Sequence, residues 1–312
     1  MQAAARGYSV AMKWLDRCRV EARDLFELVL LPCLAALLPW RLGFRLLRRL
    51  SAWLQPYAPA VAAARDQAAS RGWVGHPRHW TAVRRLVTLV DHADLYLSRT
   101  RSDRWMARHL DVVGQWPAPG EPGILVTFHW GAGMWGLRHA RAAGLRAHAL
   151  VAALDGAHFE GRRILLAYAR ARTAEVARAL GCPTLDTSTS LRPALRALRR
   201  GEQVVAAIDV PSDQVSASED IEMLGLQARM PRGLLRLAVE QRLPVTVYIT
   251  GLDVESGRRC LKISQLGVVE DITLLAQTVF GLLEQAIKAD PPAWHFWAEA
   301  DRFFMKGGGL PE

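Results

Sequence analysis

Residues 123–141 read GILVTFHWGAGMWGLRHAR, and this stretch decides the fold class. Its first part, Ile124–His129, is a short apolar run that ends on a polar side chain and predicts a buried strand. Two glycines follow, and a helical pattern begins near residue 133. A strand that passes through a glycine turn into a helix is typical of an α/β unit.

The same alternation continues along the chain. Apolar segments predict further strands at 147–154, 203–209, 244–250 and 260–266. Helical patterns occupy 79–98, 103–112, 158–180, 190–200, 231–241 and 272–288. Strands that alternate with helices favour an α/β fold, a sheet flanked by helices.

A proline- and glycine-rich break at Trp116–Gly123 divides the chain. We expect membrane-associating helices over 1–56, a helical lead-in over 57–122 and an α/β core over 123–306, with 57–306 forming one domain. A chain of 312 residues that is 51% hydrophobic is long enough to bury a sizeable core.

The net charge of +10 comes almost wholly from arginine, because lysine occurs only at positions 13, 262, 288 and 306. Zinc-finger spacing, an RNP-like aromatic motif and a basic tail are all missing, so we predict no nucleic-acid partner. An anionic membrane surface or an acidic protein partner explains the charge, and so does a genome-wide preference for arginine.

The four cysteines show no C-x-x-C pairing and fit reduced side chains in a cytosolic protein. A cleavable signal peptide is not expected, because a long charged region precedes the first apolar run and no small-residue cleavage site follows it.

The N-terminal region points to a membrane. Leu28–Trp40 carries no charge, but it contains Pro32 and is short beside the roughly 20 apolar residues of a spanning helix. Leucines and a tryptophan then recur at helical spacing beside arginines, as an in-plane interfacial helix requires. These residues are Leu42, Leu46, Leu50 and Trp53, beside Arg41, Arg45, Arg48 and Arg49. The alternatives are a helix hairpin packed on the domain with solvated arginines, and a short N-terminal anchor that spans the membrane.

The glycines of the opening stretch spell G-x-G-x-x-G at Gly131, Gly133 and Gly136, and Asp155 ends the next predicted strand. That context is typical of a dinucleotide site and allows an NAD(P)-dependent oxidoreductase as a third interpretation. Against it, His129 and Trp130 separate the strand from the first glycine, and the motif lies more than 120 residues into the chain.

Five segments, in order over roughly residues 25–305, resemble the bacterial lipid A late acyltransferases, the lauroyl and myristoyl transferases of the lysophospholipid acyltransferase superfamily. They are TFHWGAGMW, LLAYARARTA with Arg170 and Arg172, LRPALRALRRGEQVVAAID ending at Asp209, IEMLGLQARMPRGLLRLAVEQRLPVTVYIT, and AWHFWAEADRFF with Arg302 and Phe303.

The resemblance implies a mixed sheet flanked by helices, at the cytoplasmic face of the inner membrane. It implies transfer of a fatty acyl chain from acyl carrier protein, or from acyl-CoA, to a hydroxyl or amine of a lipid or lipid-like acceptor, without a cofactor or metal. His129 takes the position of the general base. Asp209, Arg170 and Arg172 fall where substrate would bind, the arginines on its phosphate groups. As alternatives, Asp209 caps a turn and the arginines are solvated helix-surface charges.

The chemistry can be stated independently of the resemblance. An alcohol is too weakly acidic to attack a thioester unaided, so a histidine within hydrogen-bond reach must remove its proton. A carboxylate on the other ring nitrogen orients the histidine. Backbone amides in the turn of Gly131 and Gly133 can hold the developing oxyanion.

The sequence departs from the family at the orienting acid, which should lie five residues after the histidine. That position is Met134, which cannot carry charge. Three interpretations stay open: an active transferase with a lone His129 or a remote acid such as Asp155, a non-catalytic subunit that binds acyl chains or carrier protein, and a misaligned motif. H-E-x-x-H metal spacing, a G-x-S-x-G elbow and a P-loop are all missing from the sequence.

Overall fold

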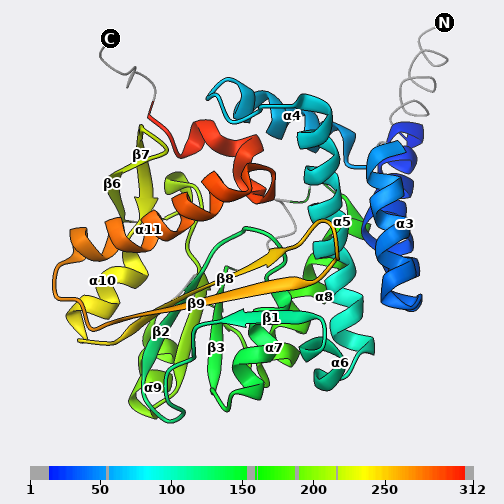
Figure 1. Ribbon diagram of the computed structural model, residues 1–312. Helices are drawn as coiled ribbons and strands as arrows, with labels where there is room; N and C mark the ends of the chain where they lie inside the picture. Colours follow the sequence, from blue (N-terminus) through cyan, green and yellow to red (C-terminus); the bar gives the residue numbers. More distant parts are fainter. Residues whose placement is uncertain are drawn as a thin grey trace, which may run out of the picture.

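A mixed seven-stranded sheet forms the centre of the computed structural model, which describes residues 14–53, 56–152, 159, 161–186, 190–215 and 217–305 (Figure 1). The strand order is β1-β9-β8-β2-β5-β3-β4, and of these pairs β8–β9 alone is antiparallel. The strands are β1 (Leu110–Val113), β2 (Gly123–Thr127), β3 (Ala147–Val151), β4 (Leu185–Asp186), β5 (Gln203–Ala207), β8 (Val245–Leu252) and β9 (Arg259–Gly267). A separate antiparallel hairpin joins β6 (Ser218–Met223) to β7 (Leu226–Pro231). The α/β class with a mixed sheet is therefore confirmed.

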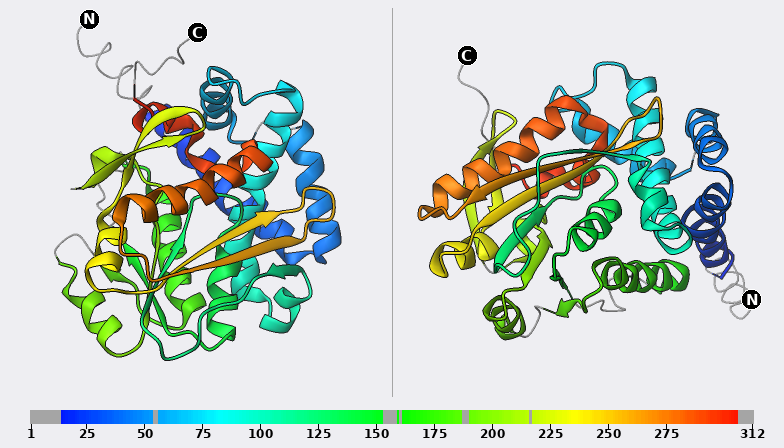
Figure 2. Two further views of the ribbon diagram at one scale, coloured as in Figure 1. Left: turned by 60° about the vertical axis from the view of Figure 1, so that its left-hand side comes forward. Right: turned by 60° about the horizontal axis from the view of Figure 1, so that its bottom comes forward.

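Helices cover both faces of the sheet, with α11 on one side and α7 and α8 on the other (Figure 2, right). The helices of the domain are α4 (Ala58–Ala69), α5 (Pro77–Thr100), α6 (Asp103–Ala107), α7 (Met134–Ala142), α8 (Arg163–Leu180), α9 (Arg192–Arg199), α10 (Gly233–Glu240) and α11 (Ile272–Ala289). A run of 3-10 turns, η4 (Pro291–Ala293) and η5 (His295–Arg302), follows α11.

The central strand β2 explains why the sheet is covered on both faces. Four of its five residues are buried, as in parallel strands with helices on each side. Leu125 belongs to the core shared with α5, α7 and α8, whereas Ile124 and Val126 belong to the core shared with α10 and α11. Successive side chains of one strand thus stabilise two separate layers.

The N-terminal helices lie outside this sandwich. They are a π-helical turn, η1 (Leu25–Leu30), then α2 (Leu31–Leu37) and α3 (Trp40–Trp53), and they pack along α5 (Figure 1). Within the described part of the chain, every helix is too short or too polar to span a membrane.

Helix α3 buries the face that carries Trp40, Phe44 and Leu47. On the face that the leucine spacing predicted to meet a membrane, Leu42 is 52% and Trp53 87% exposed, whereas Leu46 and Leu50 are half-buried. The two aromatic rings bury more apolar area than the leucines, so they decide which face contacts the domain.

Two predicted boundaries were wrong. The helix expected over 103–112 ends at Ala107, and the chain then forms β1, which pairs in parallel with β9. The helix expected from 158 begins at Arg163. The hairpin β6–β7 and the short strand β4 were not predicted; β4 has two residues, too few to show a period.

Candidate active site

The carboxyl ends of two neighbouring strands place a histidine and an aspartate side by side. Strands β2 and β5 are parallel, with Thr127 opposite Ala207 at their last residues. His129 and Asp209 each lie two residues beyond these ends. Because parallel strands finish at one edge of the sheet, where α/β proteins generally bind ligands, equal offsets bring both side chains to the same point.

Asp209 is fully buried and holds the imidazole of His129. Its Oδ1 lies 2.9 Å from His129 Nδ1, and the backbone amide of His129 donates to both carboxylate oxygens at 2.8 and 3.0 Å. With Nδ1–H donating to the carboxylate, Nε2 keeps its lone pair. The histidine side chain is 42% exposed, so the pair is open to solvent. The arrangement is that of a base oriented by an acid.

A third donor comes from the C-terminal aromatic segment. Trp294 is fully buried, and its Nε1 donates to Asp209 Oδ2 at 3.0 Å. The amide of His295 donates to the carbonyl of His129 at 2.8 Å, and the ring of Phe296 meets the His129 imidazole edge-on at 4.8 Å. Residues 294–296 therefore fix the acid, the backbone and the ring of the pair.

The glycine turn after His129 is built by close packing on β8. Gly131 has φ of +68°, and a Cβ at this position would lie 2.2 Å from the carbonyl oxygen of Thr250, so only glycine fits. The amides of Gly131 and Ala132 donate to the carbonyls of Ala293 and Thr250. The expectation that the Gly131 amide holds an oxyanion is therefore wrong, because that amide is already bonded. The first amides of α7, which follow Gly133, have no acceptor within their own helix.

His129 stands at the edge of a cavity of about 440 Å³ beneath α5, α7 and α8. This size is within the range of small-molecule sites. The wall contains both apolar and polar side chains. The apolar ones include Met134, Leu137, Leu150, Val151, Val176 and Val205, and the polar ones include Thr88, Asp91, His92, Arg172 and His295.

Among the described residues of this wall, the one permanent cation, Arg172, is paired with an anion. Arg172 Nη2 donates to Asp91 Oδ1 at 2.8 Å. Burial opposes the ionisation of Asp91, but the positive charge of Arg172 outweighs it and lowers the pKa of Asp91 to about 2. Asp91 in turn raises the pKa of Arg172, although burial opposes this. The two charges cancel, so this wall suits a neutral polar group better than a phosphate.

Two further histidines near the pair are neutral at physiological pH. Burial, helped by Arg84 and Arg172, lowers the pKa of His295 to about 4. Burial likewise lowers the pKa of His92 to about 4, and its Nδ1 contacts the hydroxyl of Tyr168. The Nε2 of His295 donates to the carbonyl of Gly131 at 2.8 Å. These two imidazoles shape the site and do not add charge to it.

Some of the predicted site residues thus line one cavity in the structure, and others do not. Gly131, Gly133, Met134 and Arg172 line the cavity with His129. Arg170 is exposed on α8 and does not line it. Asp155, the remote acid considered above, lies outside the described residues. The aspartate in contact with His129 is Asp209, which the sequence placed with the substrate and not with the base.

Two side chains of the candidate site were not predicted from the sequence. Trp294 and Asp91 sit far from His129 along the chain, in a tryptophan-rich tail and inside a long amphipathic helix. Neither position carries a motif. Burial of a carboxylate among apolar residues, as in VTLVDHADLYL, is the one signal that pointed to Asp91.

The strand order differs from that of a dinucleotide fold. There the strand after the glycine turn and helix lies next to the first strand. Here β5 separates β2 from β3, the strand that leads toward Asp155. No protein-family model matches the chain, and comparison with curated proteins finds no significant relative.

Proposed function

We propose that this chain is an acyltransferase with a lysophospholipid-acyltransferase-like fold. It transfers a fatty acyl chain from acyl carrier protein, or from acyl-CoA, to a hydroxyl or amine of a lipid-like acceptor. The observation that carries the proposal is the 2.9 Å contact between His129 Nδ1 and buried Asp209 at the edge of a largely apolar cavity.

The reaction follows from this geometry. Nε2 of His129 takes the proton of the acceptor hydroxyl or amine as that group attacks the thioester carbonyl, and Asp209 stabilises the imidazolium that forms. The first amides of α7 are the donors available to the oxyanion of the tetrahedral intermediate. When the carbon–sulfur bond breaks, the imidazolium returns its proton to the leaving thiolate. The acyl chain then lies against Leu137, Val151 and Val176.

With Asp209 as the orienting acid, Met134 has a different role. It is buried in the cavity wall, where a thioether adds apolar surface beside the acyl chain. A charge is not needed at position 134, because Asp209 reaches His129 from the neighbouring strand. The alternative of a non-catalytic acyl-binding subunit depended on a missing acid, and Asp209 removes that reason.

Replacing His129 with alanine tests the proposal. We expect His129→Ala to abolish transfer from acyl carrier protein and acyl-CoA while the melting temperature changes little, because the side chain is half exposed and Asp209 keeps the His129 amide and Trp294 Nε1 as donors. His76→Ala is a matched control, since His76 is exposed at the start of α5, away from the cavity wall. Full activity of His129→Ala would contradict the proposed chemistry and favour the accessory subunit.

We also propose that the N-terminal helices hold the enzyme at the cytoplasmic face of the inner membrane, without spanning it. Phe26, Leu30, Leu34 and Leu37 follow one another at helical spacing and are 44–64% exposed, which leaves an apolar stripe without cover from the described residues. The exposed arginines of α3 follow directly and would each contribute about 1 kcal/mol near anionic lipid.

Vesicle co-sedimentation tests this attachment. Leu30→Glu with Leu34→Glu should release the protein from vesicles that contain anionic phospholipid, because each charge would enter the apolar boundary. Leu274→Glu is the control, since Leu274 is equally exposed but belongs to α11. Binding that survives the stripe variant would exclude the stripe as the contact.

A further inference from the structure

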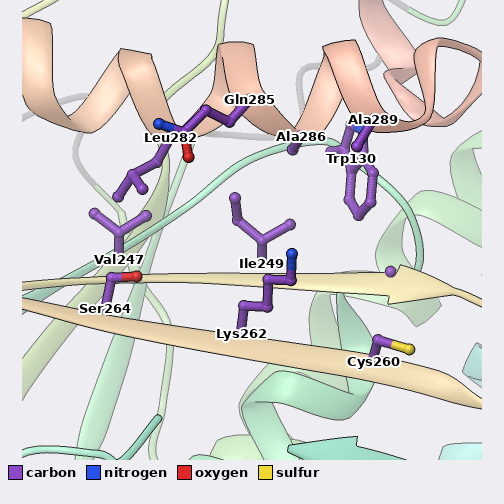
Figure 3. Close-up of a pocket in the computed structure, with 11 residues that line it drawn as sticks. Trp130, Val247, Ile249, Cys260, Lys262, Ser264, Leu282, Gln285, Ala286 and Ala289 are labelled. Atoms are coloured by element: carbon purple, nitrogen blue, oxygen red, sulfur yellow. The ribbon is translucent and has the colours of Figure 1, made fainter. Parts of the chain in front are cut away.

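A second, smaller cavity lies on the opposite face of the sheet from the acyl cavity, between α11 and strands β8 and β9 (Figure 3). Its volume is about 140 Å³. Most of its wall is apolar. The lining apolar side chains are Trp130, Val247, Ile249, Leu282, Ala286 and Ala289.

Polar groups gather at one side of this cavity. Lys262 extends from β9 toward α11, and the amide of Gln285 is turned from α11 toward the strands (Figure 3). Ser264 follows Lys262 on the same face of β9. The described residues give Lys262 no ion-pair partner, whereas Lys288 on α11 pairs with Glu284 at 2.6 Å. A cation without an anion, beside an amide and a hydroxyl, is suited to a carboxylate.

Trp130 closes the other end. Its indole stands between α11 and β8 (Figure 3), in the space left by Gly251, where a Cβ would lie 2.9 Å from the ring. The indole ring thus supplies an apolar surface at this end of the cavity.

The volume limits the ligand. An apolar cavity of about 150 Å³ in another protein holds benzene, so about six carbon atoms fill a space of this size. Longer acyl chains would not fit.

We propose that this cavity binds a small carboxylate whose apolar part contains about six carbon atoms. The carboxylate lies between Lys262 and Gln285, and the apolar part runs along Ala286 toward Trp130. Both a short fatty acid and an aromatic acid have such a carboxylate and apolar part, and the experiment below distinguishes them. This inference does not depend on the proposed acyl transfer, because the binding measurement involves no reaction.

Isothermal titration of the full-length protein with hexanoate and benzoate, and with hexanol and benzyl alcohol as uncharged counterparts, tests the site. We expect one carboxylate to bind at one site per chain, at least tenfold more tightly than its alcohol. Lys262→Met should bring acid and alcohol to equal affinity, while Lys288→Met should leave the preference unchanged. Ala286→Phe should abolish binding of both, because its ring fills the cavity.

Hexanoate preferred over benzoate identifies a short-chain fatty acid, and the reverse identifies an aromatic acid. Equal affinity for acid and alcohol in the unmodified protein would overturn the proposal, as would a preference that survives Lys262→Met. Absence of saturable binding would overturn it as well. If Ala286→Phe does not fold, the lysine variants still decide, because Lys262 and Lys288 are both at the surface.

Discussion

Two buried aspartates in this protein each hold a basic side chain beside tryptophan rings, but the two pairs differ in their access to solvent. Asp209 faces His129, whose side chain is 42% exposed. Asp94 faces Arg259, and both of these side chains are completely buried. The first pair is open to a cavity and the second is sealed in the core.

The sealed pair ties the N-terminal helices to the sheet. The Arg259 guanidinium contacts Asp94 on α5, donates to the carbonyl of Gly257 at 2.7 Å, and lies 4.4 Å from the ring centroids of both Trp40 and Trp135. One side chain of β9 thus joins α3, α5 and α7. We name these residues the arginine clamp.

The difference lies in what each base can do with a proton. Arginine stays charged in proteins, so Arg259 cannot exchange protons and its burial can only hold parts together. An imidazole can accept a proton and return it, and the partly exposed side chain of His129 can do so on a substrate. Burial of the acid is common to both pairs, whereas access to the base distinguishes the pair that we propose to be catalytic from the pair that stabilises the fold.

The largest expected effect belongs to the open pair. Asp209→Asn should lower kcat by about 10⁴-fold, because an amide no longer holds Nδ1–H and no longer stabilises the imidazolium. Steady-state acyl transfer measures this loss. Asp213→Asn, which removes an exposed partner of Arg302, should leave kcat unchanged. A kcat within tenfold of the unmodified enzyme would show that Asp209 does not orient the base.

Substitutions in the arginine clamp should lower the free energy of unfolding. Arg259→Met leaves Asp94 buried without its partner, which costs about 3–5 kcal/mol in the free energy of unfolding. Urea denaturation measures this change. The neighbouring Arg258→Met is the matched control, because Arg258 pairs with Asp111 at the surface, and its removal should not shift the denaturation midpoint.

A double variant separates lost pairing from lost packing. Asp94→Leu combined with Arg259→Met removes both charges and should recover most of the lost stability, since apolar residues of similar size can replace a buried ion pair. If the double variant is as unstable as Arg259→Met, the contacts with Trp40 and Trp135 stabilise the clamp more than the charges do.

Much of the α/β order was visible in the sequence, and so was His129. The β2 and β5 strands are short apolar runs that each end two residues before a polar side chain. Their adjacency was not visible, because β3 and its flanking helices intervene along the chain and only the crossovers of the folded sheet bring β5 against β2. A local search for the acid therefore stopped at Met134 and Asp155.

The clamp could not be predicted for a related reason. The spacing of leucines in α3 predicted a face of Leu42, Leu46 and Leu50 toward a membrane, and it did not indicate the buried face that begins at Trp40. Trp40 contacts Arg259, more than 200 residues later, which offers a cation to the indole ring. The hydrophobic periodicity of a helix shows which of its residues are apolar. Which of them are buried also depends on contacts with residues far along the chain.

The smallest expected effect refines the open pair. Trp294→Phe keeps an aromatic ring against Trp297 and Phe303 but loses the Nε1 donor to Asp209. A hydrogen bond to a charged group contributes about 1.5–3 kcal/mol, and part of this loss should appear as a fall in kcat of about tenfold with KM unchanged. Trp297→Phe is the control, because it loses the same kind of ring and a 2.6 Å bond to the carbonyl of Pro291, not to Asp209. Equal kinetic loss in both variants would mean that the aromatic segment acts by packing alone. A loss confined to Trp294→Phe would show that the buried indole positions the acid, as the rings of the clamp position Arg259.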